Sequence, residues 1–163
     1  MNTNDTTKLV ELLKEFSTAM LITREADHRL RARPMAIAGV EDSGRIWFLS
    51  AEDTEKVHEI IRDTHVHLAL QKGNSIYLSI NGVANLVHDR AKVNELWKEP
   101  FKVWFPGGKD DPKLVLISVD PEDAEYWDSH GWKGVKYLFQ AAKAYVTGTT
   151  PATEDEKHGM LKL

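Results

Sequence analysis

The feature that most constrains the fold is a succession of short strand-like segments joined by tight turns. The six segments that we predict as strands are residues 19–23, 30–40, 46–50, 65–71, 75–88 and 113–119. Most are rich in apolar and β-branched residues, and glycine, asparagine or aspartate separates several of them. Regular alternation of strands and helices, which would build a doubly wound parallel sheet, is absent. The pattern therefore predicts a mainly β domain of the α+β class, a six-stranded antiparallel barrel with peripheral helices.

Local residues add detail to these strands. Pro34 cannot donate a hydrogen bond to a neighbouring strand, so it predicts an edge or a bulge within residues 30–40. We expect the long segment 75–88 to bend at Asn81-Gly82. Residues 124–128 are expected to add one further short strand.

Four segments show the spacing of amphipathic helices, at residues 9–16, 54–62, 89–97 and 135–146. In the second, Val57, Ile60 and Ile61 are predicted to share one side. Asp89 is predicted to cap the third. We predict one domain over residues 1–148, followed by a loose polar tail over residues 149–163.

Composition excludes several classes of function. The 163 residues include no cysteine, so the chain forms no disulfide and has no thiolate zinc site or cysteine nucleophile. A formal net charge of -4 argues against a nucleic-acid-binding protein with a broad basic face. No apolar run approaches the ~20 residues that span a bilayer. We therefore expect a cytoplasmic protein without membrane or nucleic-acid partners.

Motifs for metal binding and hydrolysis are missing as well. His65 and His67 share one face of a predicted strand, but the spacing offers no third ligand, so we predict no metal site. The chain has no His-Glu-x-x-His motif, no Gly-x-Ser-x-Gly elbow and no glycine-rich nucleotide fingerprint.

Three motifs in order give a more specific signal. They are Arg33-Pro34-Met35-Ala36, then Trp47-Phe48-Leu49-Ser50 followed by residues 54–60, then Glu125-Tyr126-Trp127-Asp128 preceded by a loop with Trp104-Phe105-Pro106-Gly107-Gly108. Together they resemble the pyridoxamine 5′-phosphate oxidase superfamily, in particular its bacterial general stress protein branch. The resemblance covers about residues 9–148. It implies a split β-barrel that forms a homodimer and binds FMN at the subunit interface.

The resemblance assigns a phosphate site. At matching family positions Arg33 and Lys56 hold the phosphate, while Ser50 and Thr54 add hydroxyl donors. Arginine grips two phosphate oxygens at once, and a helix start offers free backbone N–H groups. Glu55 stands where some relatives carry a second arginine, so we expect modest affinity unless its carboxylate points away. The alternative for Arg33 is an ordinary surface ion pair.

Other matching positions surround the flavin ring. Pro34, Met35, Phe48 and Leu49 would line it, partly through backbone groups, and Tyr77 falls where relatives place a glutamine. Trp127 matches a tryptophan that reaches the flavin from the partner subunit, and Trp104 is a second candidate for that role. Both tryptophans could instead be core residues. FAD shares the proximal phosphate of FMN and is a possible cofactor.

Two functions follow from the resemblance. One is a stress-related, flavin-dependent oxidoreductase acting on an unidentified small molecule; the other is a flavin-binding carrier or sensor without turnover. Pyridoxine phosphate oxidation is not expected, because Lys133 and Val135 stand at the offsets of an arginine and a histidine that bind that substrate. A third hypothesis is a relative that binds deazaflavin or heme.

Overall fold

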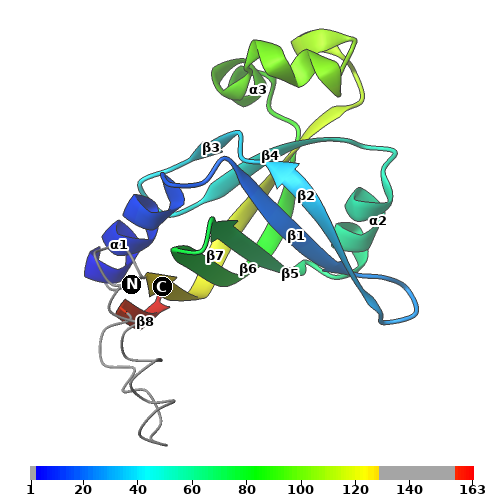
Figure 1. The fold of residues 1–163 in the computed structure, drawn as a ribbon. Helices are drawn as coiled ribbons and strands as arrows, with labels where there is room; N and C mark the ends of the chain where they lie inside the picture. The colour runs from blue at the N-terminus through cyan, green and yellow to red at the C-terminus, as the bar shows by residue number, and fades with distance from the viewer. Residues whose placement is uncertain (1–2, 129–156) are drawn as a thin grey trace, which may run out of the picture.

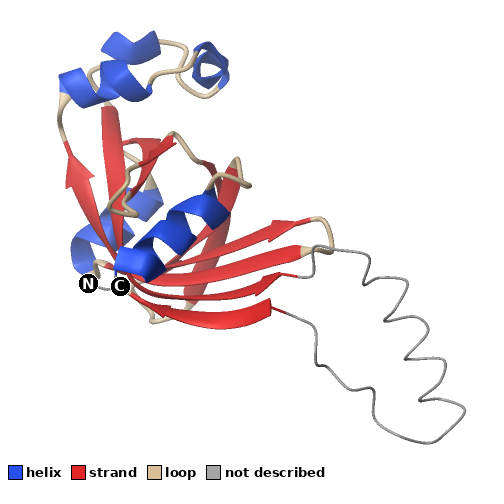
Figure 2. Cartoon of the chain, turned by 90° about the vertical axis from the view of Figure 1, so that its left-hand side faces the viewer, coloured by secondary structure: helices blue, strands red, loops and turns tan. Residues whose placement is uncertain are grey.

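The chain folds into one curved antiparallel sheet with short helices around it (Figure 1), described in a computed structural model for residues 3–128 and 157–163. The elements in chain order are α1 (Thr3–Leu13), β1 (Thr18–Arg24), β2 (Leu30–Ala36), β3 (Gly39–Val40), β4 (Ile46–Ala51), α2 (Glu55–Arg62), β5 (His65–Lys72), β6 (Ile76–Val87), α3 (Arg90–Leu96), η1 (Glu99–Val103), η2 (Gly108–Asp110), β7 (Leu114–Asp128) and β8 (Lys157–Lys162). The strand order is β2-β1-β5-β6-β7-β4-β3, and β8 pairs with β7. Figure 2 shows the sheet curling around its interior, which confirms the predicted mainly β barrel with peripheral helices.

The predicted number of strands was wrong, because the described residues contain eight rather than six. Residues 30–40 form two strands, since the chain changes partner: β2 pairs with β1 up to Ala36, and β3 pairs with β4 from Gly39. Residues 113–119 and 124–128 belong to one long strand, β7, which pairs with β4 at its start and with β6 and β8 further on. As the proline predicted, β2 lies at the edge of this sheet.

The end of the chain is also more ordered than expected. Lys157–Lys162, part of the predicted loose tail, form β8 and pair with Asp123–Asp128 of β7. Leu161 is buried opposite Ala124, so this strand contributes to the core. In Figure 1 it brings the C-terminus beside the N-terminal helix α1. The predicted helix at 135–146 lies outside the described residues.

The predicted bend in β6 is confirmed. The register between β6 and β7 shifts between Asn81 and Gly82, where Gly82 pairs with Pro121. A Cβ atom on Gly82 would lie 2.5 Å from the carbonyl oxygen of Asp120, so only glycine lets the two strands approach this closely. The bulge turns the sheet at the point where it curls.

Two apolar clusters stabilise the curled sheet. The larger fills its interior and includes Leu13 of α1, Phe48 of β4 and Ile60 of α2. The smaller lies on the other face of β4, where α3 and η1 cover it. Burial of this apolar surface is the main favourable contribution to folding.

The three predicted helices that fall in the described residues are all present, and Asp89 caps α3 by accepting from the N–H groups of Ala91 and Lys92. The predicted buried face of α2 was wrong in one position. Ile61 is 65% exposed, whereas Glu59 is only 4% exposed. The helix is rotated so that Glu59, rather than Ile61, lies against the sheet beside Val57 and Ile60.

Candidate functional site

Hydroxyl groups from β4 and the start of α2 lie together. Ser50 is at the end of β4, and Thr54 directly precedes α2 with an extended backbone (φ -91°, ψ 149°). Their side-chain oxygens are 3.1 Å apart, and Thr54 Oγ1 donates to the carbonyl oxygen of Ala51 at 2.8 Å. Because Thr54 makes no side-chain bond to the helix, the first N–H groups of α2 receive no cap from it.

One polar face of α2 is turned toward β1 and β2. Lys56, Glu59 and Asp63 recur at intervals that share one side of a helix. Glu59 Oε2 accepts from Thr23 Oγ1 at 2.5 Å and from Arg33 Nη2 at 2.9 Å. Arg33 Nη1 also donates to Thr23 Oγ1, at 2.6 Å. We refer to Thr23, Arg33 and Glu59 as the Arg33–Glu59 network.

The electrostatics of this network hold Glu59 ionised. Burial alone would raise the pKa of Glu59, but the hydrogen bonds from Thr23 and Arg33 and the charge of Arg33 outweigh burial and lower it. The arginine therefore carries a charged partner at neutral pH, and this ion pair is largely buried, unlike the surface pair that was the alternative for Arg33.

Lys56 is the second cation of the site. Burial lowers the pKa of its ammonium group, the nearby charge of Arg33 lowers it further, and Glu59 acts in the opposite direction. Among the residues described, no carboxylate forms an ion pair with it. The structure thus brings the two predicted phosphate ligands, Arg33 and Lys56, close enough to repel each other.

The charged residues nearer the surface are paired. Glu55 forms an ion pair with Arg31, and Arg31 Nε also lies 3.3 Å from a carboxylate oxygen of Glu25. Arg31 lies two residues before Arg33 and on the same face of β2, since side chains alternate along a strand. The carboxylate that was expected to weaken a phosphate site is therefore held by an arginine.

The residues predicted to line a flavin ring are placed differently from one another. Met35, Phe48 and Leu49 are buried in the apolar clusters, so they could reach a ligand only through backbone groups. Pro34 is exposed on the opposite face of β2 from Arg33. The ring site is thus not a pocket of side chains within the described part of one chain.

Tyr77 and Trp127 form cross-strand neighbours on the outer face of the sheet. The Trp127 ring stacks on His158 of β8 with centroids 5.2 Å apart and planes at 9°. Trp104 is 65% exposed and follows η1. The structure does not bring these three residues to Arg33 and Lys56 in the same chain, and the role of Trp127 in a partner subunit stays a prediction.

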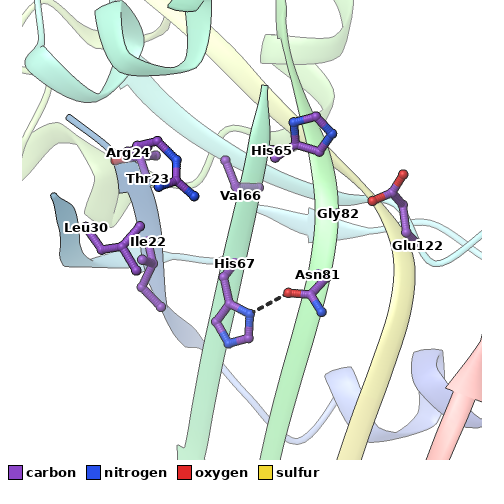
Figure 3. Close-up of a pocket in the computed structure, with 10 residues that line it drawn as sticks. All are labelled: Ile22, Thr23, Arg24, Leu30, His65, Val66, His67, Asn81, Gly82 and Glu122. Carbon is purple, nitrogen blue, oxygen red and sulfur yellow. Dashed lines mark hydrogen bonds between the residues drawn. The ribbon is translucent and has the colours of Figure 1, made fainter. Parts of the chain in front are cut away.

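A groove of about 630 Å³ lies on the outer face of β1, β5 and β6 (Figure 3). Its lining includes Ile22, Leu30, His65, His67, Asn81 and Glu122. His67 Nδ1 is 2.8 Å from Asn81 Oδ1, as drawn in Figure 3. None of the residues predicted to bind a cofactor lines this groove.

The sequence interpretation missed Thr23 and Glu59. Thr23 sits in an apolar strand segment and reads as an ordinary β-branched residue. The sequence spacing could have drawn attention to Glu59, because it follows Lys56 by three residues and so lies near it on a helix. Its burial depends on how α2 is rotated against the sheet, which residue spacing did not reveal.

Within residues 3–128 and 157–163, no helix is long and apolar enough to cross a membrane. The same residues contain no group of three or more histidine, cysteine, aspartate or glutamate side chains that could hold a metal ion.

The arrangement is that of a half-closed antiparallel barrel in which Arg33 and Lys56 lie near each other beside Glu59. Comparison with known sequences gives the family. The sequence profile described as "Pyridoxamine 5'-phosphate oxidase like" matches residues 4–152, so the chain belongs to this family.

One of two curated relatives of the chain is a general stress protein. It is 29% identical to General stress protein 26 of Bacillus subtilis over 86 residues, covering 50% of this chain and 61% of that protein. It is 28% identical to protein bli-3 of Neurospora crassa over 119 residues, covering 66% of this chain and 57% of that protein. The chain therefore spans less than two thirds of either curated relative.

Solved structures confirm the split-barrel fold. A protein from Jannaschia sp. CCS1 assigned to general stress protein 26 superposes with a TM-score of 0.74 at 24% identity, covering 98% of this chain and 99% of that one. The general stress FMN/FAD binding protein of Xanthomonas citri has a TM-score of 0.67 at 31% identity, covering 80% of this chain and 92% of that one.

Proposed function

We propose that this protein binds a flavin nucleotide, FMN or FAD, with its phosphate between Arg33 and the start of α2. The observation that carries the proposal is the pairing of two cations, since Lys56 lies partly buried beside Arg33 and lacks an ion-pair partner among the described residues. Like charges held together lower the pKa of the lysine, and an anion bound between them would remove that penalty.

The residues present fit a phosphate group. Lysine supplies a compact charge, and the Arg33 guanidinium has further N–H donors beyond the two that it gives to Thr23 and Glu59. Ser50, Thr54 and the uncapped first turn of α2 add hydroxyl and backbone donors. Backbone groups near Met35 and Phe48 would hold the ring edge, as the resemblance implies.

The relatives support this proposal at the level of the family. The Xanthomonas citri protein is described as FMN/FAD binding and shares 31% of its residues with this chain. A flavin would supply the redox chemistry, while the protein provides position and electrostatics. The carboxyl group beside Lys56 is that of Glu59, whose pKa is lowered by its hydrogen bonds from Thr23 and Arg33. We therefore assign the residues of this site to binding and orienting the flavin, and not to proton transfer.

We further propose that two copies pair through the outer face of the sheet. Four exposed large apolar side chains share that face, as strand pairing shows: Met20, Leu30, Tyr77 and Met160. A symmetric partner would cover this surface. Trp127 lies beside Tyr77 on this face, so it would belong to that interface, and its contact with a flavin of the partner subunit is what the resemblance implies.

The test of flavin binding is a titration of the purified protein with FMN, FAD and pyridoxal phosphate, followed by absorption and fluorescence. We expect saturable flavin binding in the native protein. Arg33→Ala and Lys56→Ala should each weaken it by about tenfold or more, because each removes a charged phosphate contact. The matched control is Lys92→Ala on α3, whose ammonium is paired with Glu41 and Glu95 and lies outside the site. The same loss in the control, or no flavin binding at all, would contradict the proposal.

A second measurement separates an oxidoreductase from a carrier. Flavin-loaded protein is mixed with NADH or NADPH, and the flavin absorbance is followed without oxygen. Bleaching that reverses when an acceptor is added supports the oxidoreductase, whereas flavin that stays oxidised favours the carrier or sensor. Pyridoxine phosphate is expected to give no turnover. Light scattering tests the dimer, and a monomer at working concentration would contradict the shared interface.

A further inference from the structure

Arg33 has its positive charge offset within the protein by the carboxylate of Glu59. Its Nη2 donates to Glu59 Oε2 at 2.9 Å and its Nη1 to Thr23 Oγ1 at 2.6 Å, while Thr23 donates to the same glutamate oxygen at 2.5 Å. The three groups form a closed ring of hydrogen bonds. Glu59 is 4% exposed, so solvent and salt do little to screen its charge.

The proposed phosphate site therefore has a small net charge. Arg33 and Lys56 contribute two positive charges and Glu59 one negative charge, which leaves one positive charge (2 - 1 = 1). The surrounding exposed charges add no positive charge, because Arg31 is paired with both Glu55 and Glu25. A phosphate monoester carries about -1.5 to -2 at neutral pH, whereas each phosphate of a pyrophosphate diester carries a single charge.

The size of the ligand charge matters because two energies scale differently with it. Attraction to the site grows in proportion to the charge, while the cost of removing the phosphate from water grows with its square. A site with two uncompensated cations can offset the larger cost of a dianion. A site with one uncompensated cation offsets less of the desolvation cost of a dianion.

We propose that Glu59 is a specificity-determining residue that adapts this site to a flavin whose proximal phosphate carries one negative charge. The ligand class is then the dinucleotide FAD, bound at least as tightly as the mononucleotide FMN. This inference rests on the proposed flavin site and concerns which form of flavin it selects.

The experiment compares Glu59→Gln with the native protein in titrations with FMN, FAD and riboflavin near neutral pH. Glutamine keeps the shape of the side chain and an oxygen that accepts from Arg33 and Thr23, but it removes the charge. We expect FMN to bind on the order of tenfold more tightly, FAD to gain less, and riboflavin, which has no phosphate, to be unchanged. The control is Glu95→Gln on α3, which removes an exposed charge paired with Lys92 outside the site and should change each affinity less than about twofold.

A pH series on the native protein tests the same point without a substitution. The second ionisation of a phosphate monoester has a pKa of about 6, so FMN becomes singly charged between about pH 7.5 and pH 5. If the site selects a single charge, FMN affinity holds or rises relative to FAD over this range. In Glu59→Gln it should fall relative to FAD.

The outcomes are distinct. Equal gains for FMN and FAD in Glu59→Gln, or a native site whose FMN affinity falls with the phosphate charge, would overturn the role of Glu59 while leaving flavin binding intact. An equal loss for all three ligands, riboflavin included, would overturn it as well, because it shows that Glu59 only maintains the fold. Absence of flavin binding in both proteins would overturn the proposed function itself. A selective gain for FMN supports the inference.

Discussion

Two helices close this sheet in opposite ways. α3 and the adjoining η1 cover the outer side of β4 with apolar side chains, and Trp97 and Phe101 meet edge to face with centroids 5.9 Å apart. α2 covers the edge formed by β1 and β2, and it buries Glu59 there with Arg33 and Thr23 as partners. Both helices cover part of the sheet, but only α2 buries a carboxylate against it.

The comparison supports the proposal that flavin binds at α2 rather than at α3. An apolar cluster stabilises the fold through dispersion and the hydrophobic effect, and it needs no partner groups. A buried ion pair adds little net stability, because desolvation of both charges offsets their attraction. Lys56 and Arg33 are partly buried beside Glu59 at α2, so this region carries the desolvation cost of several charges. The proposed phosphate site gives a reason for keeping these charges there.

The largest expected effect is in the apolar region. Phe101→Ala removes a buried ring and should lower the free energy of unfolding by about 3–5 kcal/mol, measured by urea denaturation. Flavin affinity of the folded protein should stay the same, because the cluster of Phe101 includes no residue of α2 or of the Arg33–Glu59 network. The matched control is Val103→Ala in the same element, 78% exposed, with an expected change within about 0.5 kcal/mol. Weaker flavin binding in Phe101→Ala would mean that the two regions are coupled.

The second effect is in the charged region. Thr23→Val keeps the shape of the side chain but removes the hydroxyl that links Arg33 to Glu59, so the buried Glu59 and the partly buried Arg33 each lose a hydrogen bond. The free energy of unfolding should fall by about 2 kcal/mol, again measured with urea. Thr18→Val on the same strand is exposed and serves as the control, with a change within about 0.5 kcal/mol. If both variants were equally stable, the hydrogen-bonded network would not be what holds α2 in place.

The sequence predicted the strands of the sheet better than it predicted the different packing of α2 and α3. Alternation of apolar residues located β5, and Asn81-Gly82 located the bend in β6, because strand faces and bulges depend on nearby residues. The division of residues 30–40 into two strands depends on which neighbour each half pairs with, and local pattern does not contain that information. β8 was missed for the same reason, since this polar segment forms a strand by pairing with β7, which is distant in sequence.

The candidate site was predictable only in part. Family motifs led to Arg33 and Lys56, which the structure does bring together. They did not lead to Glu59, because its burial follows from the rotation of α2 that leaves Ile61 exposed. The same motifs predicted Phe48 and Leu49 as ligand contacts, but their side chains are buried in the two apolar clusters. Any ligand contact there therefore depends on their backbone groups.

The smallest expected effect is the pH dependence of the charged region. The folded state lowers the pKa of Glu59 below its ordinary value of 4.5, since the bonds from Thr23 and Arg33 outweigh burial. The unfolded chain therefore takes up this proton first as the pH falls. The stabilisation is complete above the unfolded value, and it is lost as the pH drops through the folded value. Urea denaturation at a series of pH values should show the native protein losing about 1 kcal/mol more than Glu59→Gln between about pH 5 and pH 3. Parallel pH profiles for the two proteins would show that the carboxylate of Glu59 contributes no charge-dependent stability, and the distinction between the α2 and α3 regions would then rest on packing alone.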